Sequence, residues 1–134
     1  GRPVANRRRP GKRPMSSMAP LIVFENNQPV LAVGSPGGRT IPHFISRVLM
    51  ASLFWGLPPE QSVAMPHLSI RGNRLVAERD SPIPWPFALT ELSRGEQEIK
   101  SQPLNSGIAL LQRIHGRWHG VADPRREGAA MALP

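Results

Sequence analysis

A glycine-rich turn at residues 34–38, with the sequence Gly-Ser-Pro-Gly-Gly, is the stretch of this chain best suited to chemistry. An apolar run ends in it at Val33, and a long apolar-rich segment leaves from it at Ile41. A strand, a turn and a helix in that order leave the first backbone N–H groups of the helix without intrahelical acceptors. Glycine lets such a backbone approach a ligand closely. The turn is therefore a candidate anion or oxyanion site, although spacing alone favours a plain tight turn.

Two adjacent serines, Ser16 and Ser17, stand between methionines ahead of the first apolar run. Their hydroxyls could bind a ligand, or they could satisfy backbone groups at the start of a strand. Taken alone, the pair favours the second interpretation.

Other catalytic patterns are poorly represented, so we expect neither a metal nor a cofactor. His115 and His119 are four residues apart, but this spacing need not converge in a hairpin, and no HExxH pattern occurs. Ser, His and Asp123 are all present, yet the nucleophile pattern G-x-S-x-G is missing and the turn departs from it by one position. The turn also lacks the Gly-Lys-Ser/Thr ending of a phosphate-binding loop.

Positive charge is concentrated at the start of the chain. The 134 residues carry a formal net charge of +8, and residues 1–13 hold six basic residues and no acid. Proline and glycine breakers predict that residues 1–14 form an extended basic arm ahead of a single domain at 15–134. A solvated run is the usual interpretation of such an arm. A nucleic-acid-binding module is the alternative, which the absence of Tyr weakens.

Composition limits the class of protein without fixing its compartment. No apolar run is long enough to span a membrane, and no secretory signal is visible at the start. Cysteine is absent, which excludes disulfides and thiolate chemistry. Because the first residue is Gly rather than Met, we expect a processed, trimmed or excised chain.

Hydrophobic periodicity predicts an α+β fold of antiparallel hairpins with helices packed on the sheet. The expected strands are residues 21–24, buried as a continuous apolar run, and 29–33, 67–70, 74–78, 98–100, 108–114 and 117–122. The expected helices are 41–55, with Thr40 as N-cap and Gly56 as C-terminal cap, a short one at 58–65, and another at 87–94. We also expect Asp123 to pair with a neighbouring arginine in a structural role.

Three ordered stretches together resemble the gamma-glutamyltransferase (gamma-glutamyltranspeptidase) family. They are residues 10–20 (PGKRPMSSMAP), residues 33–38 (VGSPGG) and residues 120–130 (GVADPRREGAA). The resemblance covers nearly all of this chain and corresponds to the later part of the family's small subunit.

The resemblance implies an N-terminal-nucleophile hydrolase with a four-layer αββα fold, made as a zymogen that cuts itself. In that family the new N-terminal Thr attacks a gamma-glutamyl amide such as glutathione, and the glutamyl group passes to water or to an amino acid. By matching motifs, Ser16 and Ser17 would bind the gamma-glutamyl moiety, and Gly37 and Gly38 would supply backbone N–H groups to the oxyanion.

This sequence departs from the family pattern in ways that imply partners. Gly1 is not the catalytic Thr, the family's amino-binding acid lies upstream, and Arg39-Thr40 follows the glycines in place of the usual Ser-Arg. We therefore expect a C-terminal fragment that is inactive alone and needs the upstream part of the small subunit and the large subunit. An inactive paralogue is the alternative. Such a fragment is expected to self-associate, and typical members would place it in the periplasm or outside the cell.

Overall fold

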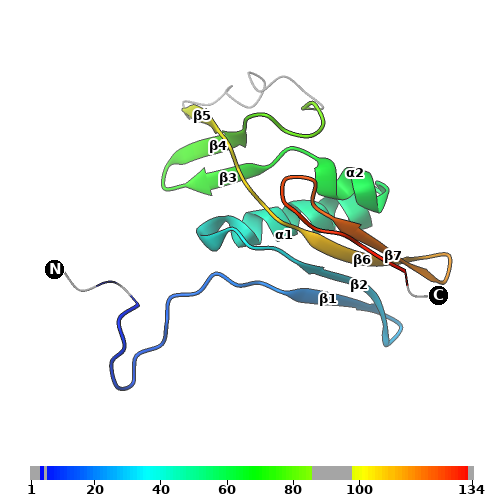
Figure 1. Cartoon of the computed structure of the whole chain (residues 1–134), viewed down its shortest axis with the longest axis horizontal. Coiled ribbons are helices and arrows are strands. Elements are labelled where there is room, and N and C mark those ends of the chain that lie inside the picture. Colours follow the sequence, from blue (N-terminus) through cyan, green and yellow to red (C-terminus); the bar gives the residue numbers. More distant parts are fainter. Residues whose placement is uncertain (1–3, 5, 86–97, 133–134) are drawn as a thin grey trace.

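The computed structural model describes Val4, residues 6–85 and residues 98–132. Two sheets enclose a pair of short helices (Figure 1). The larger sheet has the order β1-β2-β6-β7 and the smaller sheet has the order β3-β4-β5. The seven strands are β1 Leu21–Glu25, β2 Gln28–Gly34, β3 Leu68–Arg71, β4 Arg74–Glu78, β5 Ile99–Gln102, β6 Ala109–Ile114 and β7 Arg117–Ala122.

Strand pairing confirms the α+β class and the three predicted hairpins, β1–β2, β3–β4 and β6–β7. All neighbours in the larger sheet are antiparallel, and β3 pairs antiparallel with β4. The turn between β1 and β2 uses Asn26 and Asn27, both at positive φ, a conformation that asparagine tolerates. One pairing departs from the expectation: β4 and β5 run parallel, because the chain returns to this sheet edge through a long connection.

The helical segment after the turn begins as predicted but is not one continuous α-helix. A 3-10 turn, Gly38–Thr40, leads into α1, Ile41–Leu49, which continues as a π-helical segment, Met50–Phe54. Thr40 precedes α1 but does not cap it with its side chain, which corrects the N-cap prediction. Gly56 lies at φ +64°, the conformation expected of a C-terminal cap. The second helix, α2 Pro59–Ala64, is confirmed, and the predicted helix at 87–94 lies outside the described residues.

The core lies where the apolar face of α1 meets β2 and β6. Alternate residues of β2 point into it, because successive side chains of a strand face opposite sides of a sheet. The buried apolar cluster comprises Leu31, Val33, Ile41, Phe44, Ile45, Val48, Val63, Val76, Leu104, Ile108 and Leu110. This core holds the end of β2, and therefore the glycine-rich turn, against the start of α1.

The prediction of a fully buried first strand is wrong for one face of β1. Ile22 and Phe24 are 58% and 60% exposed, while Val23 packs against the core. β1 is the edge strand of the larger sheet, and helices cover only one face of that sheet. A continuous apolar run cannot distinguish a strand covered on one face from one covered on both.

Candidate active site

A cavity of about 610 Å³ contains three of the four residues singled out by sequence. Ser16 and Ser17 line it from the segment before β1, and Gly38 lines it from the turn after β2. The segment before β1 and the turn after β2 lie close together because β1 and β2 pair antiparallel. The register sets Leu21 opposite Val33 and so brings the start of β1 to the end of β2. Gly37 is not among the lining residues.

The two glycines of the turn adopt conformations that other residues avoid. Gly37 lies at φ +139° and Gly38 at φ +59°. The Thr40 backbone N–H and hydroxyl both donate to the Gly37 carbonyl oxygen, at 3.3 and 2.6 Å. These bonds fix the orientation of the peptide group between the glycines. The Gly38 N–H belongs to that peptide group and has no acceptor within the described part of the chain.

The connection between β5 and β6 supports the turn from behind. The Gly107 N–H donates to Ser35 Oγ at 3.3 Å, and Ser35 Oγ donates to the Pro36 carbonyl oxygen at 2.7 Å. A Cβ at Gly107 would lie only 2.7 Å from Pro36 Cγ, so glycine permits this close approach. Arg126 donates to the Ser106 carbonyl oxygen at 2.8 Å and holds the same connection in place.

Asn6 positions the serine pair, a role that the sequence did not indicate. Its Oδ1 accepts from the Met15 N–H at 2.8 Å, and its Nδ2 donates to the Met15 carbonyl oxygen at 3.3 Å. The amide therefore closes residues 6–15 into a loop immediately before Ser16. Asparagine can pair in this way because it carries both a donor and an acceptor, but a separation of nine residues gives no periodic signal. Ser17 is half-buried and Ser16 is exposed.

Behind the turn lies a buried ionic cluster built around Arg125. Its guanidinium pairs with Glu78 and with Asp123, and the side chains of these three residues are 5%, 3% and 1% exposed. The two terminal nitrogens of the guanidinium also donate to the carbonyl oxygens of Val63, Ala64 and Met65. The predicted pairing of Asp123 with an arginine is confirmed, and it joins α2, β4 and the segment after β7.

His67, Ser106 and Asp123 form a connected chain that is not a catalytic triad. Arg47 Nε donates to His67 Nδ1 at 3.0 Å, so the ring proton must reside on Nε2. His67 Nε2 lies 2.7 Å from Ser106 Oγ, and Ser106 Oγ in turn donates to Asp123. His67 is therefore the donor to the serine and cannot act as its base.

Burial fixes the charge states of this cluster. It lowers the pKa of His67 to about 2, with the positive charges of Arg47 and Arg125 adding to the effect. Burial alone would raise the pKa of Asp123, but hydrogen bonds from Ser106, Arg125 and Ile108 and the charge of Arg125 hold that pKa below its usual value. The cluster thus contains a neutral imidazole and an ionised carboxylate. The Phe44 ring connects it to the turn: its centroid lies 4.2 Å from that of His67, and it also packs against Gly37.

The neutral His67 predicts a specific pH dependence of stability. Unfolded histidine binds a proton below about pH 6.5, whereas the folded ring does not, so the free energy of unfolding falls as the pH falls. Between pH 6 and pH 5, His67 lowers the free energy of unfolding by about 1.2 kcal/mol. This pH range lies above the one in which Asp123 titrates. Urea unfolding of the native protein and of His67→Gln, at pH 6 and at pH 5, measures this effect. The difference between their free energies of unfolding should change by this amount between the two pH values.

The matched control for that experiment is His119→Gln on the exposed surface of β7, which leaves the buried cluster intact. Parallel pH curves for the native protein and His67→Gln would contradict the assignment of a neutral His67.

The described residues contain no group of three or more His, Asp or Glu side chains that could hold a metal ion. Nor does any helix in residues 6–85 or 98–132 have the length and apolar character needed to cross a membrane.

Comparison with known proteins identifies the family. The sequence model described as gamma-glutamyltranspeptidase matches residues 2–133. The chain is 32% identical over 132 residues to the glutathione hydrolase proenzyme of Bacillus subtilis, covering 96% of this chain and 22% of that protein. It is 31% identical over 133 residues to the proenzyme of the same name from Pseudomonas aeruginosa, covering 96% of this chain and 24% of that protein. The chain therefore spans less than a quarter of the length of these relatives.

Solved structures give the same result. A gamma-glutamyltranspeptidase from Pseudomonas nitroreducens superposes with a TM-score of 0.81 and 26% identity, over 98% of this chain and 69% of that one. The T380A mutant of the Helicobacter pylori gamma-glutamyltranspeptidase superposes with a TM-score of 0.77 and 27% identity, over 88% of this chain and 66% of that one. These neighbours are N-terminal-nucleophile hydrolases, which confirms the predicted fold class. Fold, motifs and sequence agree, and the chain belongs to the gamma-glutamyltranspeptidase family.

Proposed function

We propose that this chain supplies the oxyanion-binding and substrate-binding groups of an enzyme that transfers a gamma-glutamyl group from glutathione or a related amide to water or an amino acid. The observation that carries the proposal is the single cavity lined by Ser16, Ser17 and Gly38. Two hydroxyls and a constrained backbone N–H at one site suit a substrate that has a charged glutamyl end and a carbonyl under attack.

In the proposed reaction, a hydroxyl nucleophile from outside this chain adds to the γ-carbonyl carbon. The carbonyl oxygen becomes an oxyanion that accepts hydrogen bonds from the N–H groups of Gly37 and Gly38. The C–N bond then breaks, and the amine leaves with a proton. Water or a second amine attacks the resulting ester, which releases the glutamyl group and regenerates the hydroxyl.

Fixed N–H dipoles suit this role because they need no reorganisation when the charge develops. The Thr40 hydrogen bonds to the Gly37 carbonyl provide that rigidity. Ser16 and Ser17 would hold the glutamyl end. Ser16 Oγ accepts from the Met18 N–H at 3.2 Å, which leaves its own hydrogen available to donate to a carboxylate.

The full-length protein carrying this chain tests the proposal through hydrolysis of a gamma-glutamyl anilide. We expect turnover in the native protein. Replacing both Ser16 and Ser17 by Ala should raise KM by about tenfold or more, because each hydroxyl contributes a hydrogen bond to a charged group. Ser101→Ala, at an exposed position of β5, is the matched control. An unchanged KM in the double variant would reject the substrate-binding role.

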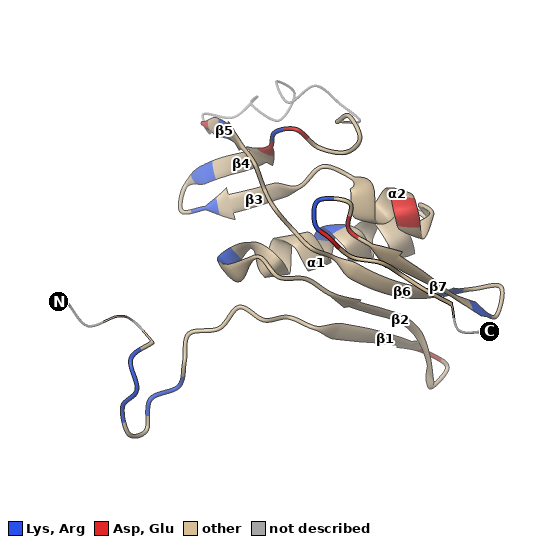
Figure 2. Cartoon of the chain, in the orientation of Figure 1, with Lys and Arg blue, Asp and Glu red and all other residues tan. Residues whose placement is uncertain are grey.

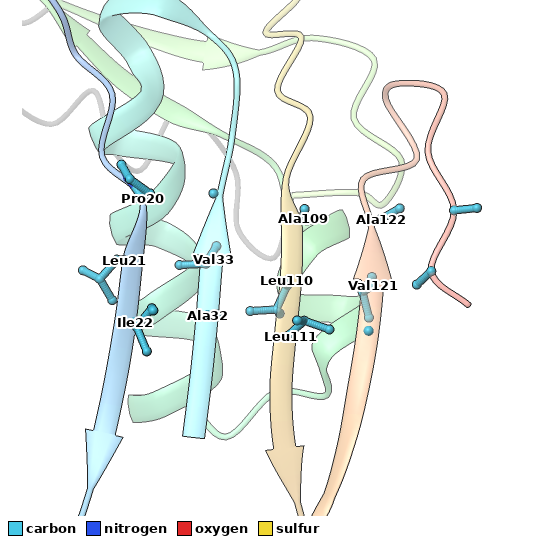
Figure 3. Close-up of a pocket in the computed structure, with 14 residues that line it drawn as sticks. Pro20, Leu21, Ile22, Ala32, Val33, Ala109, Leu110, Leu111, Val121 and Ala122 are labelled. Carbon is cyan, nitrogen blue, oxygen red and sulfur yellow. The ribbon is translucent and has the colours of Figure 1, made fainter. Parts of the chain in front are cut away.

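The larger sheet also presents a surface suited to the rest of such a precursor. A cavity of about 560 Å³ is lined by residues of β1, β2, β6 and β7 and by Ala129 and Ala130, which follow β7 (Figure 3). Register places Ile22, Ala32, Leu111 and Gly120 in one row across the sheet, on the face opposite the core. Ile22 and Leu111 are 58% and 50% exposed.

We propose that upstream parts of the same precursor cover this face, as the αββα arrangement of the family implies. The chain expressed alone should then self-associate, because an exposed apolar sheet face favours association. Light scattering measures it: a monodisperse monomer would contradict the proposed partner.

A further inference from the structure

A second hollow adjoins the candidate active site on the side of the glycine turn. Its volume is about 510 Å³, and it is lined by Arg39, Thr40, Ile70, Arg71 and Gly72. Arg39 also lines the cavity that contains Ser16, Ser17 and Gly38. The two hollows therefore meet at Arg39, next to the backbone that would bind the oxyanion.

Both arginines of this hollow are available to an external anion. Arg39 and Arg71 are exposed, and neither guanidinium has a hydrogen-bond or ion-pair partner among the described residues. Arg74, at the other end of the same β3–β4 turn, differs because it pairs with Glu98 at 3.1 Å. Free cations at the mouth of a cavity attract and orient anionic groups.

Acidic side chains are missing from the lining of both hollows. A third hollow of about 300 Å³ shares Asn6 and Pro14 with the candidate site, and its lining is strongly basic: Arg7, Arg8, Arg9, Lys12 and Arg13. Figure 2 shows basic residues in the N-terminal loop, before α1 and at the β3–β4 turn, on the same side of the molecule. The positive potential around the site is thus not cancelled locally.

Position relative to the reaction indicates which part of the substrate meets Arg39 and Arg71. The glutamyl end is assigned to Ser16 and Ser17, and the carbonyl to the glycine turn. In this arrangement the remaining part of the donor, beyond the C–N bond, would extend past Gly38 toward Arg39, which lines both hollows. The incoming amine must occupy the same place as the leaving amine, because transfer is the reverse of acylation with a different amine.

We propose that Arg39 and Arg71 form a subsite for an additional carboxylate on the leaving amine and on the acceptor, so that acidic amino acids and peptides are the preferred acceptors. This inference rests on the proposed function and adds the acceptor class to it. Arg71 determines specificity and takes no part in the covalent steps.

The experiment compares two acceptors that differ only in charge, glycylaspartate and glycylasparagine, with a gamma-glutamyl anilide as donor and the full-length protein as enzyme. The native protein should show a kcat/KM about two- to fivefold higher for glycylaspartate, the range expected for an exposed ion pair. Arg71→Gln should lower the ratio toward one, because only Arg39 remains in the hollow, and Arg71→Glu should bring the ratio to one or below. Added salt should reduce the native preference.

The matched control is Arg117→Gln, at an exposed position of β7 in the hairpin remote from the candidate site. It should keep the native ratio. A ratio that does not change in Arg71→Gln or Arg71→Glu overturns the subsite while leaving gamma-glutamyl transfer intact.

Calorimetric titration of both dipeptides into the protein separates this inference from the proposed function. If the anilide is not turned over, the proposed function fails, yet tighter binding of glycylaspartate that is lost in Arg71→Glu still supports an anion subsite. Equal affinity of the native protein for both dipeptides overturns it.

Discussion

Replacing Gly37 by alanine should lower the kcat of gamma-glutamyl hydrolysis by about 10²- to 10³-fold, the cost of losing one oxyanion donor. A Cβ built on Gly37 would lie 2.6 Å from Phe44 Cε2 and 3.1 Å from Cδ2. Phe44 is 1% exposed and packs in the core, so its ring cannot move aside. The turn must shift instead, and the Gly37 and Gly38 N–H groups shift with it. Steady-state hydrolysis of a gamma-glutamyl anilide by the full-length protein measures the effect.

Gly34→Ala is the matched control in the same turn. Its added Cβ meets nothing within 4 Å, and its φ lies outside the strained positive range. The control should retain native kcat to within about twofold, because Gly34 ends β2 and its added methyl group would meet no neighbouring atom of this chain. A native kcat in Gly37→Ala would remove the turn from the catalytic machinery.

Replacing Arg125 by methionine should destabilise the fold by about 3–5 kcal/mol, because it leaves buried carboxylates without a counter-ion. Glu78 and Asp123 would both lose their cation, and the carbonyl oxygens of Val63, Ala64 and Met65 would lose a donor. Urea unfolding at pH 7 of the native and variant proteins gives the difference in free energy of unfolding.

Arg79→Met provides the comparison for a surface ion pair. Arg79 contacts Asp80 at 3.1 Å, but their side chains are 59% and 76% exposed. Water and salt screen such a pair, so its loss should cost less than about 1 kcal/mol. If Arg125→Met cost no more than Arg79→Met, the buried cluster would not support the fold as described.

The Gly37→Ala and Arg125→Met experiments are not fully independent, because the buried cluster is connected to the glycine turn. Ser106 belongs to the cluster, and the adjacent Gly107 donates to Ser35 in the turn. Phe44 contacts both His67 and Gly37. Loss of Arg125 is therefore expected to reduce activity as well as stability, whereas Gly37→Ala should act mainly on activity.

Local sequence patterns were sufficient to predict most of the strands, helices and turns. The alternation in β2, the three- and four-residue spacing in α1 and the glycine-marked turns each depend on neighbours in sequence. The parallel pairing of β4 with β5 was not predictable in this way, because it joins segments separated by a long connection. The exposed face of β1 depends on what covers the sheet rather than on β1 itself.

The sequence by itself determined the family, the serine pair and the glycine turn, because these depend on residue types in fixed local order. Only the tertiary structure decided that Ser16, Ser17 and Gly38 line one cavity and that Asn6 holds the backbone of Met15, the residue before the first serine. It also decided that His67 is a neutral donor within a buried ionic cluster. These facts depend on burial and on contacts between residues that are 9 to 39 positions apart in sequence, which no local pattern records. Burial sets the energy of a charge, and burial is a property of the folded chain.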